Sequence, residues 1–508
     1  MPDPMADVRH YEFGISLNDT SNKINCTALI EIGFRGKTSV IHLDLDNENE
    51  SGQGMKISSL LCNGMETAWD HSGNKINIKP ALNIDKDTTL SIFIKYSGVP
   101  ADGLIISKNK FGKRTFFADH WPDRASSYLP VVDHPSDKAT VDFVITAPEH
   151  YEVVASGCMV EESDLPSGMK LTHWKEDVPI PVKVMTFAAA DFAACLSGKV
   201  NDIPVWTWVY PENRKEGFYD YAVAVKPMQF YSDLIGPYPY EKLANVQSKT
   251  IFGGLENAGC IFYTENSVTG QGKAEGLIAH EIAHQWFGNS VTEKNWHHIW
   301  LSEGFATYMA AVYDAYTYGG DHLTQTMKSD RARVLWSSAR RPRPVIDTTI
   351  TNLMNLLSVN SYQKGSWVLH MLRSEVGEQN FWKGMRLYYE RYRNDNALTG
   401  DFEKVMEEVS GEDLGKFFYQ WLYVAGEPDL IIKLAAAKKK GTSQVIIEQK
   451  QDYLFTFNIT VRLTDNGKAT DFVIPVHDRI TYTDVKVSDS AEIMIDPEVN
   501  LLFRSSDL

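Results

Sequence analysis

The sequence predicts an α+β protein of several domains, with a β-rich N-terminal domain, a mainly helical middle domain and a small β-sandwich at the C-terminal end. Three observations support this fold class. Apolar and polar residues alternate in short runs from residue 8 to about residue 200, a helical period dominates residues 273–425, and alternation returns after residue 428. These changes of pattern predict three domains, residues 1–208, 209–426 and 427–508.

The outer domains are predicted from their strands. Residues 24–32 and 89–96 alternate apolar and polar side chains between turn-forming residues, which is typical of half-buried β-strands. The pattern changes near residues 206–211, and residues 213–235 then follow a helical period. Residues 455–461 alternate again, and about eighty residues of this kind suit a small β-sandwich.

The most informative motif lies in the helical part, where His280 and His284 frame the sequence His-Glu-Ile-Ala-His. Positions i and i+4 share one face of an α-helix, so both imidazoles can reach one metal ion while Glu281 points to its open position. Glu303 follows His284 after eighteen intervening residues, on a second helical stretch that ends at Gly319. Three ligands, an open water position and a nearby carboxylate are what a zinc hydrolase requires.

A plainer interpretation is a core helix whose two histidines bond to backbone carbonyl groups. The apolar content of residues 277–287, the helix stop at Gly288 and the third ligand all favour the metal site instead. His297 and His298 have no partner at helical spacing, and we expect them to lie beside the site or at the surface.

Two further segments are ambiguous when taken alone. Residues 253–257 (Gly-Gly-Leu-Glu-Asn) place a glycine pair, which lets backbone approach a ligand closely, before a carboxylate that could pair with a substrate ammonium group. An exposed turn with a solvated glutamate would have the same sequence. Tyr362 opens a strongly helical run, a position where most tyrosines serve in packing.

In combination, four motifs resemble the aminopeptidase N and leukotriene hydrolase family of gluzincin zinc aminopeptidases. They are residues 253–257, the His-Glu-x-x-His motif, Trp-Leu-Ser-Glu-Gly-Phe-Ala at 300–306 and Tyr-x-Lys-Gly at 362–365. Shorter matches at 236–240, 418–422 and 426–428 extend the resemblance over most of the chain. The resemblance implies a saddle-like N-terminal β domain, a thermolysin-like catalytic domain and a β-sandwich.

The family's catalytic roles transfer to matching positions. His280, His284 and Glu303 would hold one zinc ion. Glu281 would be the general base that activates the zinc-bound water and then gives a proton to the leaving amine, and Tyr362 would donate a hydrogen bond to the oxyanion. The resemblance thus implies a zinc-dependent aminopeptidase that removes the N-terminal residue from peptides with a free N-terminus.

The substrate-binding roles are also implied by the resemblance. Glu256 would bind the free α-ammonium group, and its segment, with Asn257 and the backbone of Gly253 and Gly254, would align the peptide. Asp119 stands where the family supplies a longer Gln or Glu that helps to hold the amine. Either the amine then lies differently or an unusual N-terminal residue is preferred, and an ordinary loop aspartate is the alternative.

Other departures from the family pattern narrow the expected activity. Leu255 replaces a methionine that lines the pocket, which is a mild change, and Met354 replaces an acidic residue of the leukotriene hydrolases, which disfavours epoxide hydrolysis. Larger relatives add a C-terminal helical domain over the active site, whereas this sequence ends at Leu508 directly after the predicted sandwich. We therefore expect a more open cleft that admits longer peptides.

Composition excludes some classes of partner. The chain has 50 basic and 66 acidic residues and a net charge of −16, which disfavours nucleic-acid binding through a basic surface.

Cysteine usage and the N-terminal segment bear on the compartment. Five widely spaced cysteines predict free thiols in a reducing compartment. Residues 1–25 lack a signal peptide's apolar core and no stretch suits a membrane helix, so we expect a soluble, cytoplasmic protein without membrane partners; secretion or a periplasmic location after signal removal stays open.

Two functional alternatives remain beside the aminopeptidase. A thermolysin-like endopeptidase would have no use for an ammonium anchor at Glu256, and an inactive peptide-binding homologue would need neither Glu281 nor Tyr362. The basic run at 340–343 (Arg-Arg-Pro-Arg) is interpreted as a solvated loop, with a site for a substrate carboxylate as its alternative.

Overall fold

The computed structural model describes residues 3–437 and 442–505. The chain forms two compact units. The first comprises Met1–Trp296 with Tyr389–Ala397, and the second comprises His297–Tyr388 with Leu398–Leu508.

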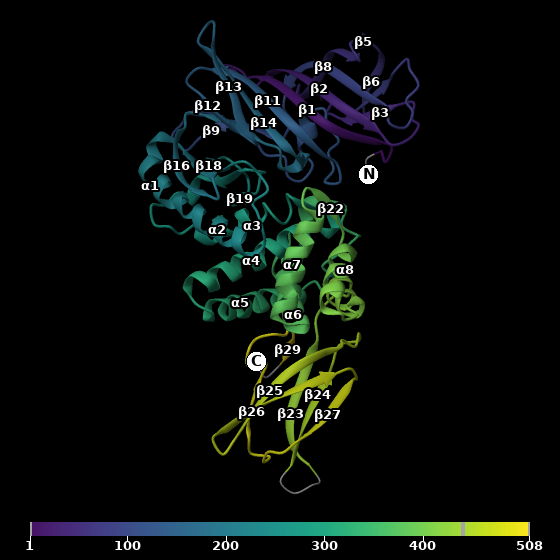
Figure 1. The fold of residues 1–508 in the computed structure, drawn as a ribbon, viewed down its shortest axis with the longest axis vertical. Coiled ribbons are helices and arrows are strands. Elements are labelled where there is room, and N and C mark those ends of the chain that lie inside the picture. The colour runs from purple at the N-terminus through teal and green to yellow at the C-terminus, as the bar shows by residue number, and fades with distance from the viewer. Residues whose placement is uncertain (1–2, 438–441, 506–508) are drawn as a thin grey trace. The chain divides into compact units, whose positions relative to one another are not determined.

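Three sheets build the N-terminal part of the first unit (Figure 1). The largest has eight strands in the order β13 (Cys158–Leu165), β14 (Met169–Pro181), β11 (Lys138–Pro148), β1 (Ala6–Ser16), β2 (Ile24–Phe34), β8 (Thr89–Val99), β4 (Gly54–Cys62), β5 (Met65–Glu66). The second has the order β12 (Glu152–Ala155), β15 (Phe187–Ala190), β10 (Arg114–Ala118), β9 (Leu104–Lys108), and the third has the order β3 (Ile41–Asp44), β7 (Lys75–Lys79), β6 (Ala68–Ser72). Alternate residues of β1 and β2 are buried, which is the one-sided burial that the alternating sequence predicts.

A five-stranded sheet completes the first unit and leads to the motif helix. Its order is β16 (Ala193–Val200), β17 (Ile203–Val209), β18 (Leu243–Ser248), β20 (Cys260–Thr264), β19 (Gly254–Leu255). Helices α1 (Arg214–Tyr221) and α2 (Val225–Leu234) connect the parallel strands β17 and β18, and α3 (Glu275–Ala283) follows β20. The short edge strand β19 pairs antiparallel with β20, so it carries the Gly-Gly-Leu-Glu-Asn segment at the sheet edge. A small parallel pair joins β21 (Val291–Glu293) to β22 (Asp395–Ala397).

The second unit combines helices with two C-terminal sheets (Figure 1). The helices in this part of the chain are α4 (Trp300–Tyr318), α5 (Asp321–Ser338), α6 (Gly365–Val376), α7 (Glu378–Tyr392, of which residues 389–392 belong to the first unit), α8 (Thr399–Ser410) and α9 (Gly415–Phe418). The sheets have the orders β27 (Ile480–Val485), β24 (Ser443–Gln449), β23 (Asp429–Ala436), β29 (Arg504–Ser505) and β26 (Lys468–Val476), β25 (Phe457–Asp465), β28 (Glu492–Ile495). Strands β24 and β25 each bury alternate residues, as expected where two sheets enclose a core.

The predicted fold class is confirmed: multi-sheet β structure comes first, helices follow, and β-sheets return at the C-terminal end. Helix α4 ends before Gly319, as predicted, whereas α3 ends at Ala283 instead of near Gly288. The five-stranded sheet takes β16 and most of β17 from before residue 209, and the expected domain limits stay predictions.

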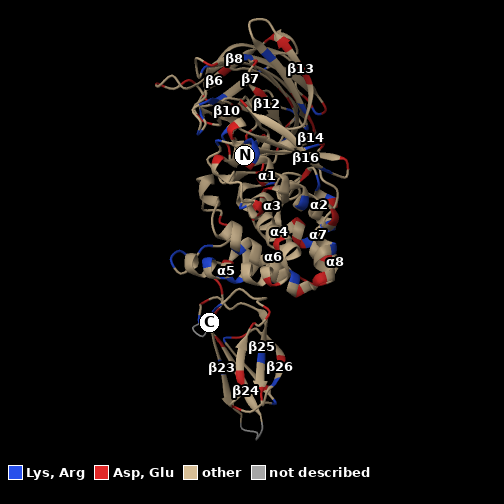
Figure 2. Ribbon diagram, turned by 90° about the vertical axis from the view of Figure 1, so that its left-hand side faces the viewer, with Lys and Arg blue, Asp and Glu red and all other residues tan. Residues whose placement is uncertain are grey.

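The cysteines and charges agree with the composition. All five cysteines are free thiols, as predicted. Acidic and basic residues are interspersed along the ribbon in the view of Figure 2, so the excess of acidic residues is not confined to one segment. In the described ranges, none of the helices is both long and apolar enough to cross a membrane.

Candidate active site

The two motif histidines converge at the C-terminal end of α3. Their ring centroids lie 4.7 Å apart, and the Nε2 atoms of His280 and His284 lie 3.1 Å apart. Helix α3 is anchored by apolar side chains on its other faces, because Ile278 and Ile282 are fully buried. The helical spacing that the sequence predicts therefore brings both rings to one point.

The ring geometry fits a metal ion. Nδ1 of His284 lies 3.2 Å from the carbonyl oxygen of Phe287, which only accepts hydrogen bonds, so Nδ1 carries the proton and Nε2 offers a lone pair. Two imidazole nitrogens bound to zinc at about 2.0–2.1 Å in a tetrahedral site lie about 3.3 Å apart, close to the observed separation. A cation shared by the two Nε2 atoms satisfies both rings.

Two carboxylates lie beside the histidine pair in the same unit. The carboxylate oxygens of Glu256 and Glu281 and a ring nitrogen of His284 all lie within 4.8 Å of one another. Both glutamates are 5% exposed. The predicted ammonium anchor and the predicted general base therefore belong to one buried cluster, although 24 residues separate them in the sequence.

The side chain of Glu256 has an unsatisfied oxygen. Its Oε1 is buried and accepts no hydrogen bond from any part of the chain that the structure describes. The backbone of this residue is fixed, since its carbonyl oxygen accepts hydrogen bonds from Gln285 Nε2 (2.9 Å) and Asn289 Nδ2 (2.6 Å). An uncompensated buried carboxylate is costly, and an ammonium group supplied by a ligand would remove that cost.

Asn257, the residue after Glu256, also has buried side-chain atoms without a hydrogen-bond partner in the described residues. It is fully buried, and neither Nδ2 nor Oδ1 has a hydrogen-bond partner among residues 3–437 and 442–505. Its backbone is fixed by the bonds from Asn257 N to Leu255 O (2.9 Å) and from Cys260 N to Asn257 O (3.1 Å). The segment after β19 thus presents two buried polar side chains with unused hydrogen-bonding capacity.

The segment that follows α3 is anchored to the N-terminal sheets. The ammonium group of Lys138 donates to the carbonyl oxygens of Asn289 (3.1 Å) and Ser290 (2.7 Å). The buried ammonium group of Lys183 forms an ion pair with Glu293 on β21. These bonds hold Asn289, and through it the backbone of Glu256.

Gly253 and Gly254 have different surroundings in the structure, a difference that the sequence alone does not show. A methyl group on Gly254 would collide with the carboxylate of Glu281, whereas one on Gly253 would meet no atom within 4 Å. Neither glycine has a positive φ. Only Gly254 is therefore required for the close approach of β19 to the motif helix.

We expect Gly254→Ala to lower kcat/KM by about 100-fold, because displacing a catalytic group by about 1 Å has an effect of this size. Gly253→Ala is the matched control and should retain most of the activity. Steady-state kinetics with an aminoacyl arylamide would measure both, and equal losses in the two variants would contradict this interpretation.

Asp119 lies close to this segment but is already bonded. It is fully buried, and its carboxylate pairs with the Arg124 guanidinium while accepting hydrogen bonds from Thr250 Oγ1 (2.9 Å) and Ile251 N (3.2 Å). Burial raises the pKa of the Asp119 carboxyl, and Arg124 opposes that rise. Both oxygens are used within the protein, and a contact of Asp119 with substrate stays a prediction. The bonds tie the strand β10 region to the loop that leads into Gly253.

The second unit carries the predicted metal ligand Glu303 and the predicted catalytic residue Tyr362. Glu303 lies in the first turn of α4 and is 3% exposed, and Tyr362 lies in a π-helical turn, η8 (Asn360–Lys364), directly before α6. A Cβ atom on Gly304 would lie 2.9 Å from the backbone of Gly365, so the two glycines allow α4 and the start of α6 to touch. This contact brings the turn of Glu303 against the turn of Tyr362.

Side-chain bonds hold the tyrosine turn in place. The buried ammonium group of Lys364 donates to Gly426 O at 2.7 Å, and burial lowers its pKa to about 8.

The two histidines before α4 bond within the second unit. His297 lies 3.0 Å from Ile350 O and His298 lies 2.8 Å from Thr399 Oγ1. Neither histidine belongs to a candidate metal-binding group in the described part of the chain.

Several positioning residues escaped the sequence-based prediction. Gln285, Asn289 and Gly304 lie inside or next to recognised motifs, but their partners are distant in sequence. Arg124 could have been suspected only from its place in the segment of Asp119. The one signal in the sequence was a glycine near each of the motif glutamates Glu256 and Glu303, because glycine marks places where backbone approaches another group closely.

Comparison with known families identifies two domains of one family. Residues 8–182 match the peptidase M1 N-terminal domain, and residues 219–421 match the peptidase family M1 domain. The second match covers both the His-Glu-x-x-His segment and the segments of Glu303 and Tyr362.

Individual relatives support the same family. The chain is 26% identical over 481 residues to probable aminopeptidase 2 of Sulfurisphaera tokodaii, covering 89% of this chain and 58% of the relative. It is 25% identical over 379 residues to glutamyl aminopeptidase of Rattus norvegicus (69% and 39%) and 30% identical over 324 residues to aminopeptidase M1-C of Oryza sativa subsp. japonica (60% and 36%). The chain thus spans 36–58% of the length of these curated relatives.

The fold is also that of a solved family member. The crystal structure of the M1 zinc metallopeptidase from Deinococcus radiodurans superposes with a TM-score of 0.73 at 24% identity, over 84% of this chain and 95% of that chain. With both characteristic domains present in sequence and the same fold in space, the chain belongs to peptidase family M1.

Proposed function

We propose that this protein is a zinc aminopeptidase that removes the N-terminal residue from peptides. The observation that carries the proposal is the position of Glu256, whose buried and unsatisfied carboxylate oxygen belongs to the same compact group as Glu281 and His284. A site with this anchor selects chain ends, because an internal peptide segment would leave the carboxylate unpaired.

Three side chains would hold the metal ion. His280 and His284 offer their Nε2 atoms, the sequence motif supplies Glu303, and two histidines with one glutamate match the donor set of catalytic zinc sites. The orientation of the His284 ring supports this assignment. When bound, zinc supplies a Lewis acid that lowers the pKa of water and polarises a carbonyl group.

The remaining chemistry belongs to the chain's own residues. Glu281 accepts the proton of the attacking water and passes it to the amine that leaves. Tyr362 donates a hydrogen bond to the negative oxygen that develops on the scissile carbonyl, a contribution of about 3 kcal/mol in sites where such a donor was removed. The Gly304–Gly365 contact supports these roles by fixing the turn of Tyr362 against α4.

The substrate's first residue is positioned by the segment after β19. Glu256 pairs with the α-ammonium group, Asn257 offers unused polar atoms, and the backbone at Gly253 and Gly254 aligns the peptide along a sheet edge. Asp119 acts as a positioning residue: its bonds to Thr250 and Ile251 brace the loop that precedes these glycines.

Metal removal tests the proposal. Treatment with a chelator should abolish hydrolysis of aminoacyl arylamides, and one equivalent of zinc should restore it, with bound metal measured by mass spectrometry. Activity that survives complete metal removal would refute the zinc mechanism. Zinc binding without hydrolysis across a broad panel of arylamides would instead indicate a peptide-binding homologue.

A further inference from the structure

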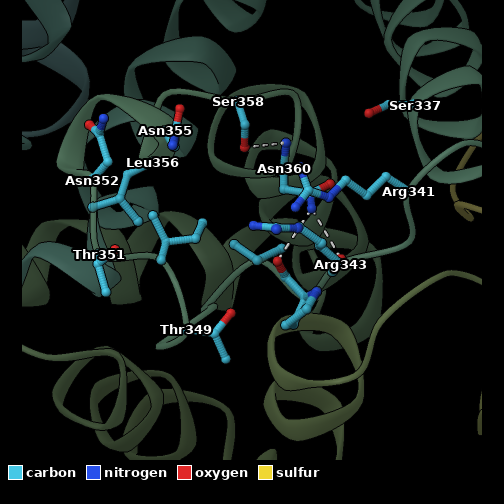
Figure 3. A pocket seen from close by; sticks show the side chains of 13 residues that line it. Ser337, Arg341, Arg343, Thr349, Thr351, Asn352, Asn355, Leu356, Ser358 and Asn360 are labelled. Atoms are coloured by element: carbon cyan, nitrogen blue, oxygen red, sulfur yellow. Dashed lines mark hydrogen bonds between the residues drawn. The ribbon is translucent and has the colours of Figure 1, made fainter.

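A polar pocket of about 370 Å³ lies in the second unit, next to the turn of Tyr362. Its wall is formed by the end of α5, the basic loop that follows and the segment that leads to η8 (Figure 3). Polar side chains line most of it, including Thr349, Thr351, Asn352, Asn355 and Ser358, and none of its lining residues is acidic.

The charged side chains that line the pocket are two arginines. Arg341 and Arg343 both line it, and the loop appears as a blue stretch beside α5 in Figure 2. The guanidinium of Arg341 forms no ion pair or hydrogen bond with any residue in the described ranges. A chain with a net charge of −16 therefore presents at least one uncompensated guanidinium in a concave, acid-free surface.

The second arginine is held in a fixed orientation. Nη1 of Arg343 lies 3.3 Å from a carboxylate oxygen of the buried Asp347. The other oxygen of Asp347 accepts hydrogen bonds from the backbone and hydroxyl of Thr349. These bonds, with the charge of Arg343, lower the pKa of the Asp347 carboxyl, so it stays ionised and orients Arg343, and it is not one of the residues that line the pocket.

The basic loop is fastened to the catalytic turn. Nδ2 of Asn360 donates to the carbonyl oxygens of Arg343 (3.0 Å) and Pro344 (3.3 Å), and these bonds are drawn in Figure 3. Asn360 is the first residue of η8, which carries Tyr362. The arginines and the predicted oxyanion donor therefore belong to one braced segment.

We propose that this pocket binds a carboxylate group of the peptide substrate. The inference rests on the proposed aminopeptidase function and specifies its substrate class: peptides that carry a carboxylate beyond the scissile bond. Arginine presents a planar fork of donors that suits carboxylates, and the hydroxyl and amide groups around it can supply further hydrogen bonds. The carboxylate can come from the peptide C-terminus or from an acidic side chain.

The test uses Arg341→Gln, with Arg340→Gln as the matched control. Both variants remove one positive charge from adjacent exposed positions, but Arg340 stacks on Trp336 and does not line the pocket. Dissociation constants would be measured by calorimetry on the zinc-loaded enzyme in a Glu281→Gln background. The probes are leucyl-glycine peptides of three to six residues as free acids and as C-terminal amides, and amidated peptides with one internal Glu or Gln.

Arg341→Gln should weaken binding of the carboxylate-bearing probes by about tenfold and leave the amidated Gln probes unchanged. Arg340→Gln should change neither, and Arg341→Lys should recover part of the loss. The free-acid and internal-Glu arms tell the two sources of carboxylate apart. Equal effects of the two Gln variants, or a loss shared by acid and amide probes, would overturn the proposal.

Failure of carboxylate binding can be distinguished from failure of the aminopeptidase assignment. If the wild-type enzyme hydrolyses none of the probes, the aminopeptidase assignment fails, while the dissociation constants still decide whether the pocket recognises carboxylates.

Discussion

Replacement of Glu281 by glutamine should reduce kcat by about 10³- to 10⁴-fold while the enzyme still binds one equivalent of zinc. The carboxylate is 5% exposed, lies in the group with Glu256 and His284, and is confined by the backbone of Gly254. Glutamine keeps the size of the side chain but cannot accept the proton of the attacking water. Removal of the Glu281 carboxylate should therefore lower kcat without changing the zinc content.

The measurement combines steady-state kinetics with metal analysis of the same preparation. Glu275→Gln, in the first turn of the same helix, removes the same charge away from the motif and serves as the control. Full activity of Glu281→Gln would exclude this residue as the base. Loss of zinc in parallel with activity would show that it acts in metal binding instead.

Replacement of Glu256 by glutamine should lower kcat/KM for substrates with a free N-terminus by about 30- to 5,000-fold, the range for removing one partner of a buried charge pair. The reason is the unsatisfied Oε1 beside the catalytic carboxylate, which we assign to the substrate ammonium group. Substrates without that charge should lose little, because they never formed the pair.

The control for this variant is Glu265→Gln. Glu265 is also a buried glutamate of the first unit, but its carboxylate bonds to Lys110 N and Lys249 Nζ within the protein. Its substitution should affect stability and not selectivity for the N-terminal amine. A uniform loss for charged and uncharged N-termini in Glu256→Gln would contradict its role as an anchor.

The sequence predicts those features of the fold that follow from the local spacing of apolar residues. Helical spacing is enough to place His280 and His284 at one point, and alternating runs are enough to predict the β-rich ends of the chain. Burial of one helix face or one strand face follows directly from such patterns. The same reasoning cannot predict how far a helix extends at its end, and α3 stops at Ala283 because the chain turns there toward β21.

The contacts between motifs depend on tertiary structure and could not be predicted. The proximity of Glu256 to Glu281 needs β19 to lie against α3, and that packing depends on the absence of a side chain at Gly254. Asp119 illustrates the same limit. Its alignment suggests a substrate contact, but the partner that occupies it, Arg124, becomes visible only in the folded chain.

The most direct test of the aminopeptidase assignment is to compare one peptide with a free N-terminus and its N-acetylated form as substrates of the zinc-loaded enzyme, with products identified by mass spectrometry. We expect release of single N-terminal residues from the free peptide and no cleavage of the acetylated one, because only the free amine can pair with Glu256. Comparable cleavage of the acetylated peptide, or cleavage at internal bonds, would contradict the account and identify an endopeptidase.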